Sequence, residues 1–259
     1  MSSVEFRELA RAAARRFGPG GRFAVGFAQG KLTRDPIFEH LLAHGLFNPP
    51  VQDPGSPANP RVMLDLGCGQ GVVAALLAQA DEAIRAGRWP ARWPQPVRTR
   101  FHGIELMPRD VARARAALGD AATFVTGDIA RSTFPAAHTV LILDVLHYLP
   151  YEAQDRVLAD VRRALEPDGR LLMRIGDADG GFGFRWSNWV DHVVTWIRGH
   201  RLPRLYCRSL SQWSDLLRQH GFDIEQRPMS EGTLFANVLL IANLRARPAS
   251  VPATSGEHS

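Results

Sequence analysis

A hydrophobic strand that runs directly into a glycine-rich turn and then into a helix constrains this chain most. Residues 62–71 read Val-Met-Leu-Asp-Leu-Gly-Cys-Gly-Gln-Gly, and helical periodicity begins at Val72. Glycine lacks a Cβ, so the backbone can adopt positive φ and approach a ligand closely, and the helix that follows offers free N–H groups. The segment therefore predicts a turn that binds a nucleotide-like or carboxylate-bearing ligand.

The spacing of the glycines separates this turn from the dinucleotide-binding fingerprint. That fingerprint requires G-x-G-x-x-G, and the same frame would put Val72 in the place of the third glycine. The chain has G-x-G-x-G instead, with Gly67, Gly69 and Gly71. The spacing therefore does not favour a nicotinamide dinucleotide.

From Val62 onward, short apolar runs alternate with helical patterns, which indicates βαβ units and a parallel sheet. The last two apolar runs lie close enough in sequence to pair as an antiparallel hairpin. We predict an α/β fold with a seven-stranded, mostly parallel sheet, an antiparallel last strand and helices on both faces. The expected strands cover residues 62–66, 100–105, 122–126, 139–144, 170–175, 222–228 and 236–244, and the expected helices between them cover residues 72–86, 109–118, 151–165 and 210–220.

Two helices are expected ahead of the first strand. Apolar side chains recur at helical spacing over residues 4–17, and Pro36 suits the first position of a second helix over residues 36–46. A glycine-rich connection, residues 23–31, is expected to join them. These elements predict an N-terminal helical extension, residues 1–48.

We expect a single domain over residues 1–245, because a sheet of this kind with added helices commonly reaches this size. Within it, residues 60–245 form the ligand-binding core. Residues 177–205 hold glycines and three tryptophans and are expected to insert as a lid over the edge of the sheet. The tail, residues 246–259, is rich in Pro, Ser and Thr and is expected to be disordered.

Charge and cysteine content narrow the class of protein. The net charge of +5 would suit a nucleic-acid partner, but Lys31 is the single lysine among 31 basic residues. A general preference for arginine therefore explains the charge equally well. The two cysteines are far apart and lack C-x-x-C spacing, which argues against a disulfide framework and a structural zinc site. We expect neither a nucleic-acid partner nor a bound metal.

The sequence also indicates the cellular location of the protein. No run of 18 apolar residues occurs, and the first 17 residues carry charges throughout and lack the apolar centre of a signal peptide. We therefore expect a cytoplasmic protein without a transmembrane span.

Acidic residues stand at the ends of successive expected strands. Asp65 closes the first strand, and Glu105, Asp128 and Asp144 end or follow the next three. Open α/β sheets bind ligands at the carboxyl ends of their strands, and a carboxylate in the position of Glu105 suits the two hydroxyls of a ribose. Each acid alone could be a turn or helix cap. Four of them in register with a glycine-rich turn favour a binding site.

In these residues the chain resembles the class I S-adenosylmethionine-dependent methyltransferases, whose first motif reads acidic-x-Gly-x-Gly-x-Gly after the first strand. Asp65, Gly67, Gly69 and Gly71 match that motif at every position. The resemblance covers roughly residues 62–244. It implies a Rossmann-like fold, S-adenosylmethionine as the cofactor and methyl transfer as the reaction.

The resemblance also implies which residues contact the cofactor. The glycine turn would lie against its methionine portion, Asp128 would face the adenine amino group while Ile129 packs on the ring, and Asp144 would lie beside the transferable methyl. Cys68 is expected to contribute backbone rather than a nucleophile. The implied cofactor-binding residues are Asp65, Gly67, Cys68, Gly69, Gly71, Glu105, Leu106, Asp128, Ile129 and Asp144.

The methyl acceptor is less constrained. Transfer from a sulfonium is an in-line displacement, to which an enzyme contributes mainly alignment, with a general base where the acceptor must lose a proton. His147 follows the fourth strand beside Tyr148, and an unperturbed imidazole pKa of about 6.5 would suit a catalytic base. A packing histidine is the equal alternative. Residues 186–197 share an apolar helical face that would suit an acceptor lid, a membrane-surface helix or a helix docked on the sheet.

These features favour a small, partly apolar or aromatic acceptor. The pattern GKL-x-x-DP over residues 30–36, together with residues 142–149 and 229–240, looks similar to bacterial methyltransferases of polyene-pigment and lipid biosynthesis. An RNA or protein methyltransferase, and a non-catalytic module that keeps the cofactor fold, remain the alternatives.

Overall fold

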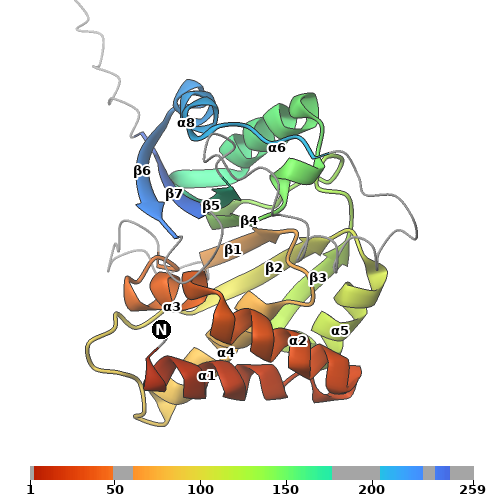
Figure 1. Cartoon of the computed structure of the whole chain (residues 1–259), viewed down its shortest axis with the longest axis vertical. Coiled ribbons are helices and arrows are strands. Elements are labelled where there is room, and N and C mark those ends of the chain that lie inside the picture. Colours follow the sequence, from red (N-terminus) through yellow and green to blue (C-terminus); the bar gives the residue numbers. More distant parts are fainter. Residues whose placement is uncertain (1–2, 49–60, 177–204, 230–236, 246–259) are drawn as a thin grey trace, which may run out of the picture.

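Figure 1 shows a computed structural model of the chain, which describes residues 3–48, 61–176, 205–229 and 237–245. Its helices are α1 (Val4–Arg15), α2 (Gly21–Arg34), α3 (Pro36–Ala43), α4 (Val72–Arg85), α5 (Pro108–Leu118), α6 (Tyr151–Ala164) and α8 (Leu210–Gln219). Its strands are β1 (Arg61–Leu66), β2 (Thr99–Glu105), β3 (Ala122–Thr126), β4 (Ala137–Leu143), β5 (Leu165–Gly176), β6 (Phe222–Pro228) and β7 (Asn237–Leu244). Three short 3-10 helices are η1 (Gly18–Gly20), η2 (Gly119–Ala121) and η3 (Leu146–Tyr148).

The sheet has the strand order β3-β2-β1-β4-β5-β7-β6. Neighbours from β3 to β5 pair in parallel, whereas β7 lies antiparallel between β5 and β6. The prediction of a seven-stranded, mostly parallel sheet with an antiparallel last strand is confirmed. Because the chain returns from β3 to place β4 beside β1, the ends of β1 and β4 flank a switch in strand order, where open α/β sheets bind ligands.

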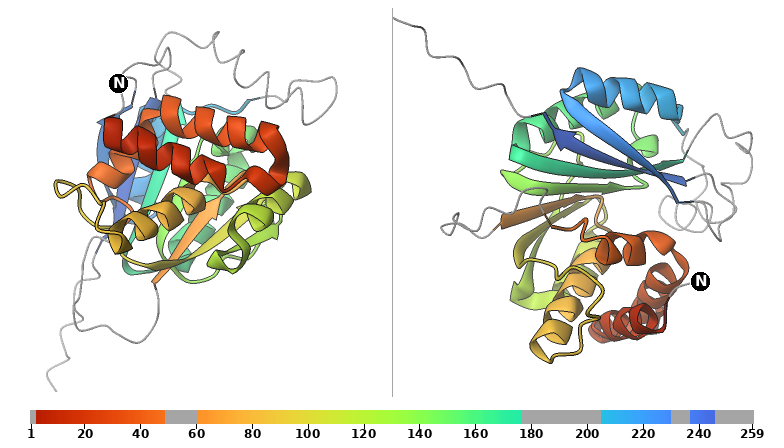
Figure 2. Two further views of the ribbon diagram at one scale, coloured as in Figure 1. Left: turned by 90° about the horizontal axis from the view of Figure 1, so that it is seen from below. Right: turned by 90° about the vertical axis from the view of Figure 1, so that its left-hand side faces the viewer.

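Helices cover both faces of the sheet, as predicted. Figures 1 and 2 show α1, α2, α4 and α5 on one face and α6 and α8 on the other. The N-terminal helices share one apolar core with α4 and α5, in which Phe6, Leu41 and Leu76 are buried. A second core, with Val157 and Leu217, fills the face under α6 and α8.

The expected glycine-rich connection over residues 23–31 is wrong, because this stretch lies inside α2. Ala24, Ala28 and Leu32 recur at intervals of four residues and are fully buried in the core that α2 shares with α1. Each glycine inside a helix costs about 1 kcal/mol relative to alanine. Burial of the apolar stripe, at roughly 25 cal/mol per Å², outweighs that cost.

The expected start of the fifth strand is also wrong, since β5 begins at Leu165 rather than at Arg170. Residues 167–169, expected as a turn ahead of the strand, lie within it as a bulge. Pairing continues on both sides of the bulge, with Leu165 opposite Ala137 and Arg170 opposite Thr139. The turn residues bend the strand locally without ending its pairing with β4.

Among the described residues, no helix has the length and apolar character needed to cross a membrane. Residues 177–204 of the expected lid, with the apolar helical face over residues 186–197, lie outside the described residues. The expected tail over residues 246–259 does so too.

Candidate functional site

The turn between β1 and α4 requires glycine at three positions. Gly67, Gly69 and Gly71 adopt φ values of 78°, 56° and 81°, all in the left-handed region that other residues avoid. A Cβ at Gly67 would collide with the side chain of Val145, and a Cβ at Gly71 would lie 2.9 Å from the ring of Phe124. The turn is therefore packed closely against β3 and the segment after β4.

The end of β2 holds this turn in place. The N–H groups of Gly67 and Cys68 both donate to the carbonyl oxygen of Ile104, at 2.8 and 3.2 Å. The N–H of Gly69 donates to Oε2 of Glu105 at 2.9 Å. One carboxylate at a strand end thus fixes the central glycine of the turn.

Glu105 is arranged to accept further hydrogen bonds. Its Oε1 accepts the N–H of Met107 at 2.9 Å, and each carboxylate oxygen can accept more than one donor. Burial raises the pKa of Glu105, and the N–H groups of Met107 and Gly69 oppose that rise. Beside it, Leu106 is 48% exposed and presents apolar surface at the same strand end.

Asp65 is the most perturbed carboxyl group of the turn. Its side chain is 3% exposed, and burial together with the charge of Glu105 raises its pKa to about 8. Burial also raises the pKa of the Cys68 thiol, which therefore stays protonated at neutral pH. A protonated thiol that packs inward is a poor nucleophile, so the turn offers backbone and carboxyl groups to a ligand.

Asp128 and Ile129 follow β3 in a turn of their own. Oδ1 of Asp128 accepts the N–H of Ala130 at 2.9 Å, and the Asp128 side chain is 40% exposed. Ile129 is buried in the core on the α6 face. The side chain of Asp128 is therefore partly exposed after the end of β3, whereas that of Ile129 lies inside the core.

Asp144, which follows β4, is tied into a cluster of four charges. Nε of Arg174, in β5, donates to Oδ1 of Asp144 at 2.8 Å, and Nη2 donates to Oδ2. The same guanidinium donates to both oxygens of Asp35, at the corner between α2 and α3. Nζ of Lys31 lies 2.9 Å from Oδ2 of Asp35 and 3.6 Å from Oδ2 of Asp144.

Both carboxylates of this cluster are ionised. Burial alone would raise the pKa of Asp35 and of Asp144, but the charges of Lys31 and Arg174 outweigh burial and hold both pKa values below the usual range. Two cations therefore balance two anions. Because both oxygens of Asp144 accept hydrogen bonds from Arg174, the orientation of this side chain is fixed by protein groups.

Sequence reasoning did not identify Lys31, Asp35 or Arg174 as site residues. Two signals were present: an arginine inside an apolar run over residues 171–175, and a lysine four residues before an aspartate within the GKL-x-x-DP pattern. The partners themselves are far apart, since Asp35 and Arg174 are separated by 139 positions. The structure brings them together at the carboxyl ends of β4 and β5.

Gln70, in the glycine turn, was also missed. Its side chain is 2% exposed, and its Nε2 donates to the carbonyl oxygen of Ala24 at 2.8 Å. This hydrogen bond joins the turn to α2. The N-terminal helices therefore contact both the glycine turn and the end of β4.

His147 and Tyr148 lie in η3, just after Asp144. His147 is 8% exposed, and its ring centroid lies 4.1 Å from that of Tyr148. Burial lowers the pKa of His147 to about 4, although Asp144 opposes the change. Burial and Asp144 raise the pKa of Tyr148 to about 12. The expected pKa near 6.5 for His147 is therefore too high, and at neutral pH the imidazole is neutral and the phenol protonated.

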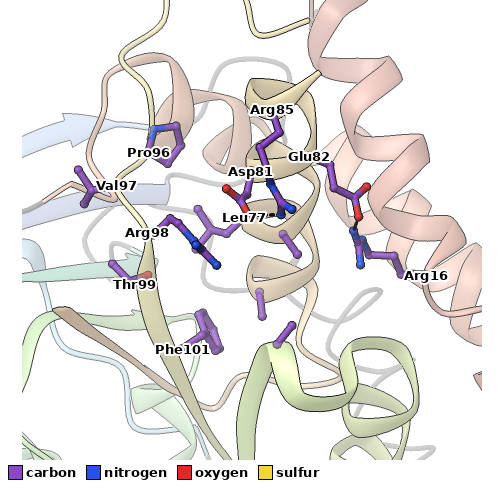
Figure 3. A pocket seen from close by; sticks show the side chains of 13 residues that line it. Arg16, Leu77, Asp81, Glu82, Arg85, Pro96, Val97, Arg98, Thr99 and Phe101 are labelled. Carbon is purple, nitrogen blue, oxygen red and sulfur yellow. Dashed lines mark hydrogen bonds and ion pairs between the residues drawn. The ribbon is translucent and has the colours of Figure 1, made fainter. Parts of the chain in front are cut away.

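A cavity of about 240 Å³, drawn in Figure 3, lies elsewhere on the sheet, between α4 and the start of β2. Leu77 and Phe101 supply apolar surface, and Figure 3 shows Glu82 paired with Arg16 beside them. The cavity is lined by Thr99, the first residue of β2, whereas Glu105 is the last. It therefore lies at the opposite end of the strand from the glycine turn.

Within the described residues, no group of three or more His, Cys, Asp or Glu side chains is placed to hold a metal ion. The site consists of backbone N–H groups, carboxyl groups, a buried imidazole and a phenol at one edge of the sheet.

Comparison with known protein sequences gives two matches. Residues 63–169 match a family model described as "Methyltransferase domain". Over 114 residues, 42% of this chain, the sequence is 33% identical to a carboxy-S-adenosyl-L-methionine synthase from Chromohalobacter salexigens. The aligned stretch spans 37% of the length of that relative.

Comparison with solved structures shows a shared fold. The magnesium protoporphyrin IX methyltransferase from Synechocystis PCC 6803, solved with bound S-adenosylhomocysteine (SAH), gives a TM-score of 0.53 at 19% identity, over 90% of this chain and 93% of that chain. An O-methyltransferase family protein from Burkholderia thailandensis gives a TM-score of 0.60 at 19% identity, over 92% of this chain and 64% of that chain. Residues 63–169 thus match a methyltransferase domain, and the chain shares the fold of these solved methyltransferase structures.

Proposed function

We propose that this protein transfers the methyl group of S-adenosylmethionine (SAM) to a small, partly apolar or aromatic acceptor. The observation that carries the proposal is the hydrogen bond between Gly69, at the centre of a turn with three left-handed glycines, and Glu105 at the end of β2. That carboxylate can accept additional donors, which suits the two hydroxyls of the cofactor ribose. The N-terminus of α4 supplies positive potential for the carboxylate of the methionine portion.

The remaining cofactor contacts follow from the positions of the other carboxyl groups. Asp128, exposed at the end of β3, is suited to accept the adenine amino group, and Leu106 offers apolar surface to the ring. Asp65 lies directly before the turn and is suited to face the ammonium of the methionine portion.

The acceptor side is formed by the segment after β4. A neutral His147 is able to take up a proton when the acceptor loses one, and a protonated Tyr148 is able to donate a hydrogen bond. The solved structures that share this fold include a magnesium protoporphyrin IX methyltransferase, whose name supports a small acceptor.

The experiment that tests this proposal uses SAM labelled in its methyl group. The pure protein is incubated with the labelled cofactor and with separate small-molecule, RNA and protein fractions of a cell lysate. We expect label in the small-molecule fraction and stoichiometric formation of SAH. Label in RNA or protein would show that the acceptor is a macromolecule and not a small molecule. No label in any fraction would favour a non-catalytic binding module. Conversion of the cofactor itself to a carboxylated product would favour the activity named for the relative from Chromohalobacter salexigens.

Replacing Glu105 by alanine should weaken the binding of SAH by about 1.5–3 kcal/mol, the usual cost of removing a charged hydrogen-bonding partner. The loss has two sources, the ribose hydroxyls and the Gly69 N–H that Glu105 fixes. Titration calorimetry measures the change. The matched control is Glu152→Ala, at an exposed position in the first turn of α6, which should leave the affinity unchanged. Equal affinities of the two variants would contradict the assignment.

Binding of SAH should release a proton from Asp65. In the free protein the pKa of this carboxyl group is about 8, so it is mostly protonated at pH 7. An ammonium beside it would lower that pKa, and affinity would then rise with pH between about 6 and 8, by up to about tenfold per pH unit. Calorimetry in buffers of different ionisation enthalpy counts the proton. Asp65→Asn should abolish its release, and a wild type that binds SAH without releasing a proton would contradict the proposed contact.

The raised pKa of Asp65 also affects the stability of the free protein. An unfolded Asp ionises near pH 4, whereas the folded group ionises near pH 8, so stability is lost as the pH rises through this range. Asp65→Asn removes that loss. The Tm of the variant should exceed that of the wild type by more at pH 8 than at pH 5. A difference in Tm that does not vary with pH would contradict the raised pKa.

A further inference from the structure

The cluster of charges around Arg174 has no part in the contacts proposed above. Arg174 is 4% exposed and lies in β5 between the buried Met173 and Ile175. Replacing a buried ion cluster by apolar side chains of similar volume is often neutral or stabilising, because dehydration of the charges offsets their attraction. Such a cluster is therefore weak evidence for a stabilising role, and its place at the carboxyl ends of β4 and β5 points to a role at the site.

One effect of the cluster is on the backbone of Asp144. This residue adopts φ of 60°, a left-handed conformation that is unfavourable for residues with a Cβ. Arg174 binds it three times: Nε and Nη2 donate to the two carboxylate oxygens, and the carbonyl oxygen of Arg174 accepts the N–H of Asp144 at 3.3 Å. Such a conformation persists where its surroundings hold it from several sides.

The turn at Asp144 sets the position of the residues that follow. Val145 packs so closely on Gly67 that any side chain there would collide with it. His147 comes two residues later in η3, where the N–H of Tyr148 donates to the carbonyl oxygen of Val145 at 3.1 Å. A change of φ at Asp144 would therefore move Val145 away from the glycine turn and redirect η3.

We propose that Arg174 is a positioning residue for methyl transfer. By holding Asp144 in its left-handed conformation, it fixes residues 145–148 against the glycine turn. Through its second pair of hydrogen bonds, to Asp35, it fixes the corner between α2 and α3 at the same edge of the sheet. The role in catalysis rests on the proposed function, whereas the placement of the turn is tested without an acceptor.

The test compares two arginines of the same strand. Arg174→Lys keeps the charge but cannot form four hydrogen bonds with two carboxylates. The control is Arg170→Lys, because Arg170 donates to the carbonyl oxygens of Leu46 and Asn48 and to Asn243, away from the turn. We expect Arg174→Lys to accelerate hydrogen exchange at the amides of η3 and its C-cap at least tenfold while exchange in β1 stays unchanged, and Arg170→Lys to leave η3 unaffected. Unchanged exchange in η3, or equal acceleration across the whole sheet, would overturn the proposal.

A second pair of variants removes one positive and one negative charge together. These variants test the proposal even where Arg174→Lys does not fold. Arg174→Met combined with Asp144→Asn, and Arg174→Met combined with Asp144→Ala, each remove one cation and one anion and leave the pair of Lys31 and Asp35. Asn tolerates a left-handed φ, whereas Ala does not. Slow exchange in η3 should survive in the Asn variant and be lost in the Ala variant. Equal exchange in the two would overturn the role assigned to the conformation of Asp144.

Catalysis and cofactor binding separate this proposal from the proposed function. Turnover is measured with saturating labelled SAM and with the lysate fraction that accepts the methyl group. Arg174→Lys should lower kcat at least tenfold while its affinity for SAH changes less than threefold. Equal losses of kcat and affinity would overturn a role confined to residues 145–148. If the wild-type protein does not bind SAH, the proposed function is wrong. The hydrogen-exchange experiment would still decide whether Arg174 holds the turn at Asp144.

Discussion

Replacing His147 by alanine is expected to lower kcat about a hundredfold, a typical contribution of a general base, while the affinity for SAH stays nearly unchanged. The imidazole lies in η3, beyond the residues proposed to bind the cofactor. His44→Ala, at an exposed position after α3, is the matched control and should leave turnover unchanged. Steady-state kinetics with the identified acceptor measures both variants.

The pH profile gives a second measure of the same role. Only the neutral imidazole accepts a proton, so activity should fall as the pH falls through the pKa of His147, about 4 in the free protein. At saturating SAM, where the ionisation of Asp65 in the free protein does not contribute, the wild-type profile of kcat/KM for the acceptor should therefore stay flat on its acidic side down to about pH 5. The acidic limb should be absent in His147→Ala. A variant that loses thermal stability or SAH binding together with turnover would show a packing histidine. Unchanged turnover would show that the base lies elsewhere or that none is used.

Replacing Gly67 by alanine is expected to reduce SAH affinity more than a hundredfold. The residue has φ of 78°, and a Cβ would collide with Val145, so the backbone of the turn must shift. A displacement of this turn would remove several of the proposed cofactor contacts at once. Titration calorimetry measures the loss of affinity, and thermal unfolding measures the accompanying loss of stability.

Gly87, just beyond the end of α4, provides the control for this variant. It has φ of 65°, and a Cβ there would meet no atom within 4 Å. Gly87→Ala should therefore cost about 1–2 kcal/mol of stability from backbone strain and leave SAH affinity unchanged. If Gly67→Ala bound SAH as well as Gly87→Ala does, the turn would not be the cofactor site.

The sheet and the glycine turn could be predicted because their signals are local. A hydrophobic run that ends in Asp65 and Gly67 specifies a strand, a turn and a helix within a few positions of each other. The helix α2 was missed because its glycines lower helix propensity, while burial of Ala28 and Leu32 against α1 supplies the compensating stability. That packing depends on tertiary contacts, which the helix propensities of the individual residues do not reflect.

The electrostatics of the site could not be predicted for a related reason. The pKa of His147 depends on burial, and the choice of Arg174 as the partner of Asp35 depends on contacts across 139 positions. The sequence placed Asp144 correctly at the end of β4 but did not show that Arg174 occupies both of its oxygens. Residue types at strand ends thus predicted a candidate site, and packing determined which protein groups its side chains contact.

Titration calorimetry of one wild-type preparation with SAM and, in parallel, with NAD tests the central claim most directly. The glycine turn has G-x-G-x-G spacing and Val72 where a dinucleotide site needs glycine, so we expect micromolar binding of SAM and no binding of NAD. Binding of NAD in the absence of any binding of SAM would contradict the assignment of the glycine turn to SAM.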